Sequence, residues 1–544
     1  MCAYNAFRNE PSCGSQLLNQ MLREELGWDG HVVSDCTAIE LMGDAKYDGC
    51  APPYPPVNCK PDPFSGHNFT HGVVETANVA FTAGVDSNCG PFYRMWLGAL
   101  AANGSVAQAD VDLAVTRVYR TAVRLGLLDD PAEGRPYAQL DAAAVDSPAH
   151  RALALTAARE SIVLIKNDAA GSAPILPLSG GGKGLKLAFI GPHANSTQAF
   201  LSNYHGDNRL VDSHSPLAAA LARGLDVVYS RGCNICDSVP PGFPNMPCTT
   251  KSFDTSGIAP AAAAAAAADV AVLFLGSDQT TEAENFDRNA ITLVGAQEQL
   301  LAAVLAANSN TVVVFVSGGV VSSPAAISGA PSILYSFYGG ELAGEAIVDT
   351  LTGVISPAGK LPVTMYLPSI ALRDIRDVDL ASAGGITHLY FNGPVLRPFG
   401  WGLNYAQISF EASFGATRVG ALRVSRGALA AGPADTLTTL RVRATSAAAS
   451  TMASDCVVLV FLRPRAAAAA AAAAAALPRQ ALVAFVRLRA IAPGDAREHE
   501  FELSARAMFG AFRGERGALV PPRGTYGLSV GDVDAEETLE VEVE

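Results

Sequence analysis

Residues 1–128 alternate short apolar runs with stretches whose apolar positions recur at helical spacing. This alternation predicts strands at Met1–Tyr4, His31–Ser34 and Val85–Asp86. It predicts helices at Ser15–Leu26, Val73–Thr82 and Asp110–Leu125, the last ended by Gly126. Strands that alternate with helices indicate a parallel α/β unit.

A second α/β domain is predicted over residues 148–402, after a linker at residues 129–147 that contains Pro and Gly. Its strands are near-continuous apolar runs, as expected when helices cover both faces of a sheet. The predicted strands are Leu185–Ile190, Asp226–Tyr229, Asp269–Leu275, Thr311–Val316 and Ile333–Phe337. The clearest helices are Glu298–Ala307 and Glu341–Leu351.

The pattern changes again at about residue 403, where a second linker is predicted at residues 403–433. Short strands separated by turns then indicate an all-β sandwich over residues 434–544. Its strands are predicted at Leu440–Arg443, Cys456–Leu462, Leu482–Leu488, Glu498–Leu503 and Tyr526–Val530. Ala466–Ala476 is a pure alanine tract, which we place in a loop of this domain as low-complexity sequence without function.

Length and charge narrow the class of protein. A chain of 544 residues is too long for one core, so several domains are expected. The formal net charge is −14, and the basic residues form no clustered stripe. We therefore expect neither a nucleic acid nor a membrane as partner. Alanine tracts are too weakly apolar to be membrane spans.

The ten cysteines allow two interpretations where they form a C-x-x-C pair, at Cys233 and Cys236. Such a pair is used in zinc and redox sites. No second pair with zinc-finger spacing follows, which favours a disulfide in a loop. Sequons at Asn68, Asn103 and Asn195 are typical of a secreted glycoprotein, so we expect an extracellular or cell-wall location.

The first candidate for chemistry is Asp35, which ends the apolar strand of His31–Ser34. Catalytic residues of parallel barrels lie at the C-terminal ends of strands. Asp is also a good helix N-cap, and Thr37 onwards could be helical. The fragment by itself leaves both interpretations open.

The second candidate is the segment Gly276–Arg288, which directly follows the predicted strand Asp269–Leu275. It contains four acidic residues and one Arg. Loops at the carboxyl edge of a parallel sheet face ligand crevices. The alternative interpretation is a solvated acidic loop.

Together these segments resemble glycoside hydrolase family 3, and the resemblance covers nearly the whole chain. Met1–Asp35 is similar to the family stretch from C-x-Y-N to V-V-S-D. The other matching segments are Gly84–Asp86, Ala157–Asn167, Ile190–Asn195, Ser317–Gly319, Gly359–Thr364 and Pro398–Tyr405. The resemblance implies a multidomain fold: the C-terminal part of a (β/α)8 barrel, an α/β sandwich domain, and a fibronectin III-like β-sandwich.

The resemblance also implies a branch of the family. Cys36 follows the nucleophile position, where many β-glucosidases of the family have Trp. Asp278-Gln279, then Glu282-Ala283-Glu284, resembles the β-xylosidase branch, which includes α-L-arabinofuranosidases. The implied substrate is an oligosaccharide of plant or algal cell-wall type, from which terminal β-D-xylose is released. Arabinofuranosidase and β-glucosidase activities are the alternatives.

The implied mechanism is retaining, with two carboxyl groups about 5–5.5 Å apart and neither metal nor cofactor. Asp35 would be the nucleophile. Glu282 is the first choice for the acid/base from the second domain, and Glu284 is the second choice. Tyr4 could hydrogen-bond the Asp35 carboxylate, or it could simply pack in the barrel. Arg288 is expected to pair with a neighbouring acid.

The barrel, however, needs about 250 residues. Only 128 residues precede the first linker, so we expect an N-terminally truncated barrel with an open edge. A catalytically incomplete fragment, or a vestigial carbohydrate-binding protein, is therefore the second hypothesis.

Overall fold

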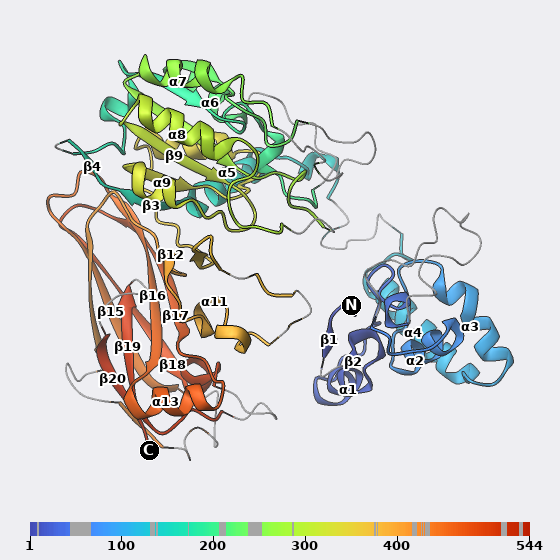
Figure 1. Cartoon of the computed structure of the whole chain (residues 1–544). Coiled ribbons are helices and arrows are strands. Elements are labelled where there is room, and N and C mark those ends of the chain that lie inside the picture. The colour runs from blue at the N-terminus through green and yellow to red at the C-terminus, as the bar shows by residue number, and fades with distance from the viewer. Residues whose placement is uncertain are drawn as a thin grey trace. The chain divides into compact units, whose positions relative to one another are not determined.

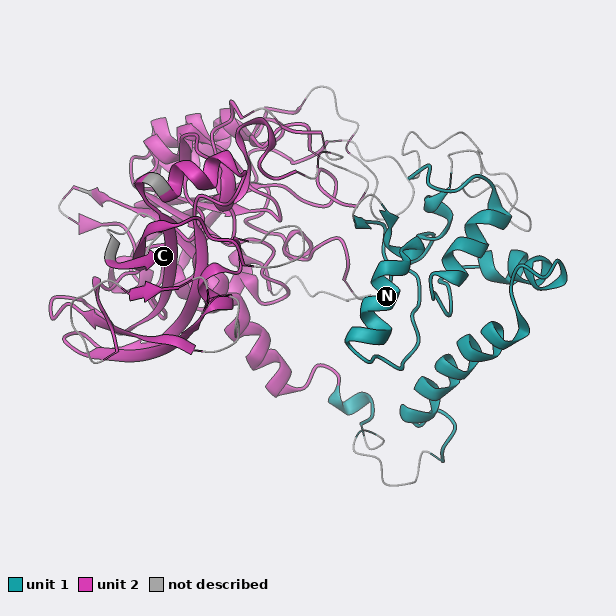
Figure 2. Cartoon of the chain, turned by 90° about the horizontal axis from the view of Figure 1, so that it is seen from below, with its two compact units in different colours: residues 1–144 teal, residues 145–544 magenta. Residues whose placement is uncertain are grey.

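The computed structural model describes residues 1–7, 10–43, 67–130, 137, 140–171, 173–205, 214–237, 248, 253–284, 288–370, 372–374, 377, 379–415, 422–425, 427, 429, 436–512, 519–531 and 537–544 (Figure 1). The chain divides into two compact units, residues 1–144 and 145–544, which are described separately (Figure 2).

Unit 1 consists mainly of helices, together with short segments that pair in parallel. Its longer helices are α2 (Val73–Thr82), α3 (Phe92–Ala102) and α4 (Gln108–Arg124). The shorter elements are β1 (Ala6–Phe7), β2 (Glu10–Pro11), η1 (Ser12–Gly14), α1 (Gln16–Gln20), η2 (Met21–Glu25), η3 (Glu40–Met42) and η4 (Ala142–Ala144). The predicted helices at residues 15–26, 73–82 and 110–125 are confirmed, although the first turns π-helical at Met21. The helix α3 was not predicted.

The three predicted strands of unit 1 are reduced to single bridges. Cys2 pairs with Ser34, and Val33 pairs with Ser87, both in parallel. The backbone amide of Ser34 donates to the carbonyl of Ser87 at 3.0 Å, and that of Cys2 donates to Val33 at 2.9 Å. The predicted parallel arrangement of these segments is therefore confirmed, while their predicted length is not.

A buried ion-pair cluster ties the strand segments of unit 1 to its helices. The side chain of Asp86 is 2% exposed and binds Arg23 at 2.9 Å and Arg117 at 3.0 Å. It also accepts a hydrogen bond from the amide of Val32 at 2.8 Å. A carboxylate buried without such partners would strongly destabilise the fold. Asp86 therefore has a structural role that the sequence analysis did not identify.

The first part of unit 2 is a six-stranded sheet with strand order β3-β10-β9-β8-β6-β7. Its strands are β3 (Val163–Asn167), β6 (Lys186–Ile190), β7 (Asp226–Ser230), β8 (Val270–Gly276), β9 (Thr311–Val316) and β10 (Ser332–Tyr335). All pairings are parallel except that of β3 with β10. The five predicted strands are confirmed to within two residues, and β3 is an addition.

Helices and short elements precede, separate and follow these strands along the chain (Figure 1). They are α5 (Pro148–Ser161), β4 (Ala169–Ala170), β5 (Ala173–Pro174), η5 (Ser179–Gly182), η6 (Gln198–Phe200), α6 (Pro216–Ala222), α7 (Ile258–Ala266), α8 (Gln297–Ala307), α9 (Pro324–Gly329) and α10 (Ala343–Leu351). Successive residues of β8 enter two different cores: Val272 and Phe274 join one, and Ala271 and Leu273 join the other. All seven residues of β8 are buried, which explains its uninterrupted apolar sequence.

The second part of unit 2 is a β-sandwich. One sheet has the order β13-β15-β18, and the other has the order β14-β20-β19-β16-β17. The strands are β13 (Ile408–Phe414), β14 (Leu422–Val424), β15 (Thr436–Ser446), β16 (Ser454–Pro464), β17 (Ala481–Ile491), β18 (Ala496–Ser504), β19 (Gly524–Gly531) and β20 (Glu537–Val543). Before and within it lie β11 (Met365–Tyr366), η8 (Ser382–Gly384), α11 (Thr387–Tyr390), β12 (Val395–Arg397) and α14 (Ala505–Phe509).

Two predictions for this region need correction. The segment 403–433 is not only a linker, because β13 and β14 pair into the two sheets of the sandwich. The alanine tract is not a loop, because Ala466–Ala474 form the helix α13. Alanine has the highest helix propensity of all residues. Ala468 and Ala472, one turn apart, are 0% and 1% exposed in the sandwich core.

The C-x-x-C pair does not form a disulfide with itself. Cys236 bonds to Cys248, while Cys233 is a free, buried thiol whose pKa burial raises to about 12. The disulfide expected in this loop is present, but it joins Cys236 to Cys248, the third cysteine of the group, rather than to Cys233. Among the described residues, no helix is long and apolar enough to cross a membrane.

Candidate active site

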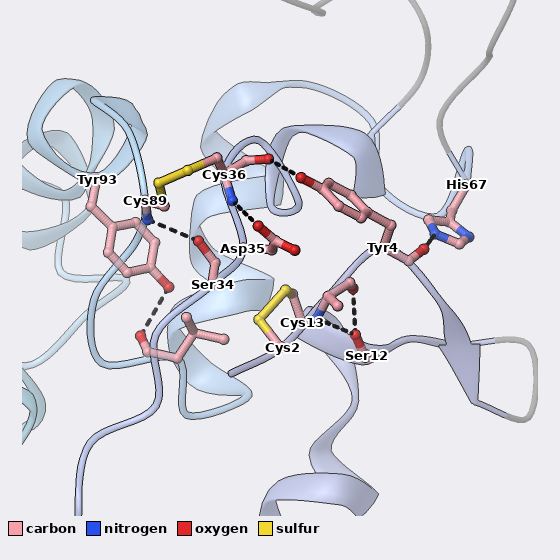
Figure 3. Close-up of a disulfide and its surroundings, with 12 residues drawn as sticks. Cys2, Tyr4, Ser12, Cys13, Ser34, Asp35, Cys36, His67, Cys89 and Tyr93 are labelled. Carbon is pink, nitrogen blue, oxygen red and sulfur yellow. Dashed lines mark hydrogen bonds between the residues drawn. A yellow bond between two sulfur atoms is a disulfide. The ribbon is translucent and has the colours of Figure 1, made fainter. Parts of the chain in front are cut away.

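Asp35 lies where the chain leaves the central strand segment of unit 1 (Figure 3). Its backbone amide donates to the carbonyl of Cys2 at 2.7 Å, which extends the parallel contact by one residue. Its Oδ1 accepts a hydrogen bond from the amide of Cys36 at 2.8 Å. The side chain is half-buried. Asp35 therefore occupies the C-terminal end of a parallel strand, as the sequence predicts.

The alternative role of Asp35 as a helix cap is not supported. An N-cap side chain accepts from an amide two or three residues further on, whereas Asp35 accepts from the next residue. The chain then turns through Thr37, whose φ is +67°, before a single 3-10 turn at Glu40–Met42. No α-helix begins at Asp35, so its carboxylate is not needed to cap one.

Tyr4 lies beside this turn, but its hydroxyl has a different partner from the expected one. It donates to the carbonyl of Cys36 at 2.7 Å rather than to the carboxylate of Asp35. The carbonyl of Tyr4 in turn contacts Nε2 of His67 at 2.7 Å. Tyr4 thus fixes the backbone next to Asp35, and it is 41% exposed rather than packed in a core.

Two disulfides hold the segments that surround Asp35 (Figure 3). Cys2 bonds to Cys13, and Cys36 bonds to Cys89. The second disulfide links the residue after Asp35 to the loop that follows the neighbouring strand segment. The hydroxyl of Ser34 accepts from the amide of Cys89 at 3.1 Å at the same place. A disulfide therefore holds the residue after Asp35, and a hydrogen bond holds the residue before it.

In unit 2, the acidic loop follows β8 and begins with a tight turn at Asp278. The carboxylate of Asp278 accepts from the amide of Thr280 at 2.9 Å and from its hydroxyl at 2.5 Å. Burial raises the pKa of Asp278, and the hydrogen bonds from Thr280 oppose this rise. The carbonyl of Asp278 accepts from the amide of Glu282 at 2.9 Å. Asp278 therefore shapes the loop that presents Glu282.

The carboxylate of Glu282 is surrounded by donors from three other segments. Oε1 accepts from the amide of Gly318 and from the hydroxyl of Tyr338, each at 2.5 Å. Oε2 lies 3.3 Å from the amide of Gly319 and 3.3 Å from Nε of Arg288. The side chain is 15% exposed, so this part of the loop is not simply solvated. The predicted pairing of Arg288 with a neighbouring acid is confirmed.

Glu284 has a more open environment. It is exposed, accepts a hydrogen bond from the hydroxyl of Tyr204, and donates its amide to Oδ1 of Asn203 at 2.9 Å. Both partners follow β6. The two glutamates therefore contact different loops at the same edge of the sheet. Glu282 contacts the loops after β9 and β10, whereas Glu284 contacts the segment after β6. Asp287, also part of the motif, lies outside the described residues.

Two features of the Glu282 environment were not predicted. Gly318 and Gly319 let the loop after β9 approach closely, since a Cβ at Gly319 would lie 3.2 Å from Oε2 of Glu282. Tyr338 follows β10, and its pKa is raised by burial and by the adjacent Glu282. β8, β9 and β10 are neighbours in the sheet, so their loops meet at one edge. Only the strand order could have revealed this meeting.

A family model matches part of unit 2. Residues 162–405 match the model described as Glycosyl hydrolase family 3 C-terminal domain. The matched region contains the β8 loop, Glu282 and the residues that surround it.

The relatives extend the similarity beyond the family 3 domain. The chain is 35% identical to the probable exo-1,4-beta-xylosidase bxlB of Aspergillus fumigatus, over 97% of this chain and 63% of that protein. It is 31% identical to the exo-1,4-beta-xylosidase bxlB of Emericella nidulans, over 100% of this chain and 65% of that protein. The chain thus spans somewhat less than two thirds of these relatives.

A solved structure supports the multidomain α/β fold. A GH3 exo-beta-xylosidase (XlnD), in complex with a xylobiose aziridine activity-based probe, superposes with a TM-score of 0.80 and 26% identity. The superposition covers 99% of this chain and 65% of that one. Unit 1 and unit 2 therefore both have counterparts in a family 3 enzyme.

Proposed function

We propose that this chain carries the catalytic carboxyl groups of a retaining, exo-acting glycoside hydrolase that releases terminal β-D-xylose from xylan-derived oligosaccharides. The observation that carries the proposal is the Glu282 carboxylate, held by donors at the carboxyl edge of the family 3 domain. Asp35, at the end of its strand in unit 1, supplies the second carboxylate. The names of the relatives support xylosides as substrates.

In the proposed mechanism, Asp35 attacks the anomeric carbon and forms a covalent glycosyl-enzyme. Glu282 protonates the departing glycosidic oxygen. It then takes a proton from water, which attacks the same carbon and frees Asp35. The hydroxyl of Tyr338 both donates and accepts, so it can remain bound to Glu282 in either protonation state.

Glu282 is preferred to Glu284 because its position is fixed. General acid catalysis requires a proton donor held within hydrogen-bond reach of the leaving oxygen. Four donor groups fix Glu282, whereas Glu284 is exposed on the β6 side of the loop. Residues 1–128 are proposed to be the C-terminal part of a (β/α)8 barrel, consistent with the parallel bridges.

The disulfides of the chain favour an oxidising compartment, so we propose an extracellular or cell-wall location. The sequons at Asn68 and Asn103 agree with this location. The proposed substrate is an oligosaccharide of plant or algal cell-wall type.

The first test measures hydrolysis of an aryl β-D-xyloside by the chain and by Asp35→Ala. We expect Asp35→Ala to abolish turnover and the exposed control Asp110→Ala to retain it. Near-normal activity of Asp35→Ala would show that another residue is the nucleophile. Absence of turnover in the unmodified chain would favour the alternative of a catalytically incomplete, carbohydrate-binding protein.

The second test separates the two glutamates. Loss of the acid/base should spare aryl xylosides with good leaving groups, and azide should restore turnover by attacking the glycosyl-enzyme. We expect this behaviour from Glu282→Ala and not from Glu284→Ala. The opposite result would assign the role to Glu284.

The third test concerns the sugar. The kcat/KM for aryl β-D-xyloside is compared with the values for aryl α-L-arabinofuranoside and aryl β-D-glucoside. The proposal requires the xyloside to be preferred. Preference for either other glycoside would assign the chain to that activity instead.

A further inference from the structure

The parallel strands of the family 3 domain contain a topological switch point. The chain runs from β6 to β7 on one side and then returns to β8 on the other side of β6. Loops that leave adjacent strands in opposite directions open a crevice at the carboxyl edge of the sheet, where α/β proteins bind ligands. This crevice is expected from the strand order alone.

A cavity of about 500 Å³ lies at this place, and the described residues that line it all belong to unit 2. Its walls come from the loops that follow β6, β7 and β8, and we name it the switch-point pocket. The lining residues include Asn195, Gln198, Arg231 and Gln279. Glu282 and Glu284 are not among the lining residues. A volume of this size is in the range of small-molecule sites.

Three amide side chains of the switch-point pocket are anchored at one end only. Oδ1 of Asn195 accepts from Ser215 at 2.9 Å, which leaves its amino group for a ligand. Gln198 and Gln279 use their amino groups, toward His205 and the carbonyl of Leu201, which leaves their carbonyl oxygens. The pocket therefore combines fixed donors with fixed acceptors. A hydroxyl group matches both, because it donates and accepts.

The charges of the pocket favour a neutral ligand. Arg231 is the one cationic side chain among the described lining residues, apart from histidines, and Asp278 is the one carboxylate.

The buried His193 adds one orphan group, because its Nε2 has no partner in the described structure although the residue is only 1% exposed. Buried polar groups without a partner are rare in native proteins.

We propose that the switch-point pocket is a second saccharide-binding site, which takes a neutral sugar of one or two units, such as xylose or xylobiose. Its fixed amides bind the sugar hydroxyls. The choice of sugar rests on the proposed function, whereas the pocket and its polar character do not.

The experiment is calorimetric titration of xylobiose, and then xylose, into the full chain carrying Asp35→Ala, which prevents turnover. We expect a binding event that belongs to the switch-point pocket, in addition to any binding at the proposed active site. The double variant Asn195→Ala/Gln198→Ala and the single variant Arg231→Met, from a different loop, should each weaken it about tenfold or more. Gln407→Ala, exposed in the segment before the sandwich, is the matched control and should leave binding unchanged.

Three results would overturn the proposal: no binding of either sugar, binding that both pocket variants leave intact, or binding of inorganic phosphate in place of sugar. Circular dichroism of each variant verifies that the fold is retained. The readout is independent of catalysis. A chain that binds sugar here but hydrolyses no xyloside would refute the proposed function alone, and an active chain without this binding would refute the pocket alone.

Discussion

The hydroxyl of Tyr338 lies 2.5 Å from Oε1 of Glu282, although the two residues are 56 positions apart in the sequence. They meet because β8 and β10 flank β9 in the sheet. The loop after β9 places Gly318 against the same Oε1. Tyr338 is therefore a positioning residue for the proposed acid/base.

Replacing Tyr338 by Phe tests this relationship. We expect kcat for aryl β-xylosides with poor leaving groups to fall about 10- to 100-fold, because a hydrogen bond to a charged group contributes about 1.5–3 kcal/mol. Substrates with good leaving groups, which need little acid assistance, should be affected less. The comparison is made by steady-state kinetics with a series of aryl xylosides.

The matched control is Tyr229→Phe, a partly exposed tyrosine of β7. It should leave the leaving-group dependence unchanged. A Tyr338→Phe variant that slows all substrates equally would indicate a general structural role for Tyr338.

His193 gives a pH-dependent contribution to stability. Burial lowers its pKa from 6.5 to about 3 in the folded chain. Below pH 6.5 the unfolded chain takes up a proton that the folded chain does not, so this residue destabilises the fold increasingly as the pH falls from about 6.5 toward 3. The slope contributed by His193 is at most about 1.4 kcal/mol per pH unit.

His193→Asn removes this titration, so its free energy of unfolding, relative to the unmodified chain, should increase as the pH is lowered from 6.5 to 4.5. Urea unfolding at several pH values, followed by fluorescence, measures the difference. The exposed His150→Asn is the control and should run parallel to the unmodified chain. Parallel curves for His193→Asn would contradict a neutral, buried His193.

The sequence predicted elements whose burial is uniform and missed features that depend on long-range pairing. β8 was predicted because every residue in it is buried, so its pattern is unambiguous. The loop after β8 was predicted to lie at the carboxyl edge of the sheet because it follows β8 directly in the sequence. Tyr338 was missed because its approach to Glu282 depends on the order of three strands, which local patterns do not encode.

The two errors in the sandwich have a similar origin. β13 has mostly half-buried residues, so it lacks the contrast that marks a strand. β14 has three residues, too few for a period to be recognised. In α13 all side chains are identical, so no apolar face can be read from the sequence. Which alanines are buried is decided by the sandwich against which they pack.

The Cys36–Cys89 disulfide should restrict motion of the backbone around Asp35. Native disulfides typically contribute about 2–4 kcal/mol, mainly by constraining the unfolded chain. We expect Cys36→Ser/Cys89→Ser to increase hydrogen–deuterium exchange in residues 30–40, measured by mass spectrometry. Cys236→Ser/Cys248→Ser should increase exchange in its own loop and leave residues 30–40 unchanged. Equal exchange in both double variants would show that this disulfide does not hold the Asp35 segment.

The helix α13 allows a direct test of its packing, because it contains both buried and exposed alanines. Ala472 is 1% exposed, whereas the next residue, Ala473, is exposed. Ala472→Asp would place a carboxylate among the apolar side chains of the sandwich core, where no described cation compensates it in the core cluster. An unpaired buried charge typically destabilises a fold by several kcal/mol, so we expect a lower thermal unfolding midpoint for this variant.

Ala473→Asp carries the same change in helix propensity and charge, but its side chain reaches water. Its unfolding midpoint should stay close to that of the unmodified chain, since exposed substitutions usually change stability by about 0.5 kcal/mol or less. Differential scanning calorimetry of the two variants compares them directly. If both variants unfold at the same temperature, α13 does not pack on the sandwich through Ala472.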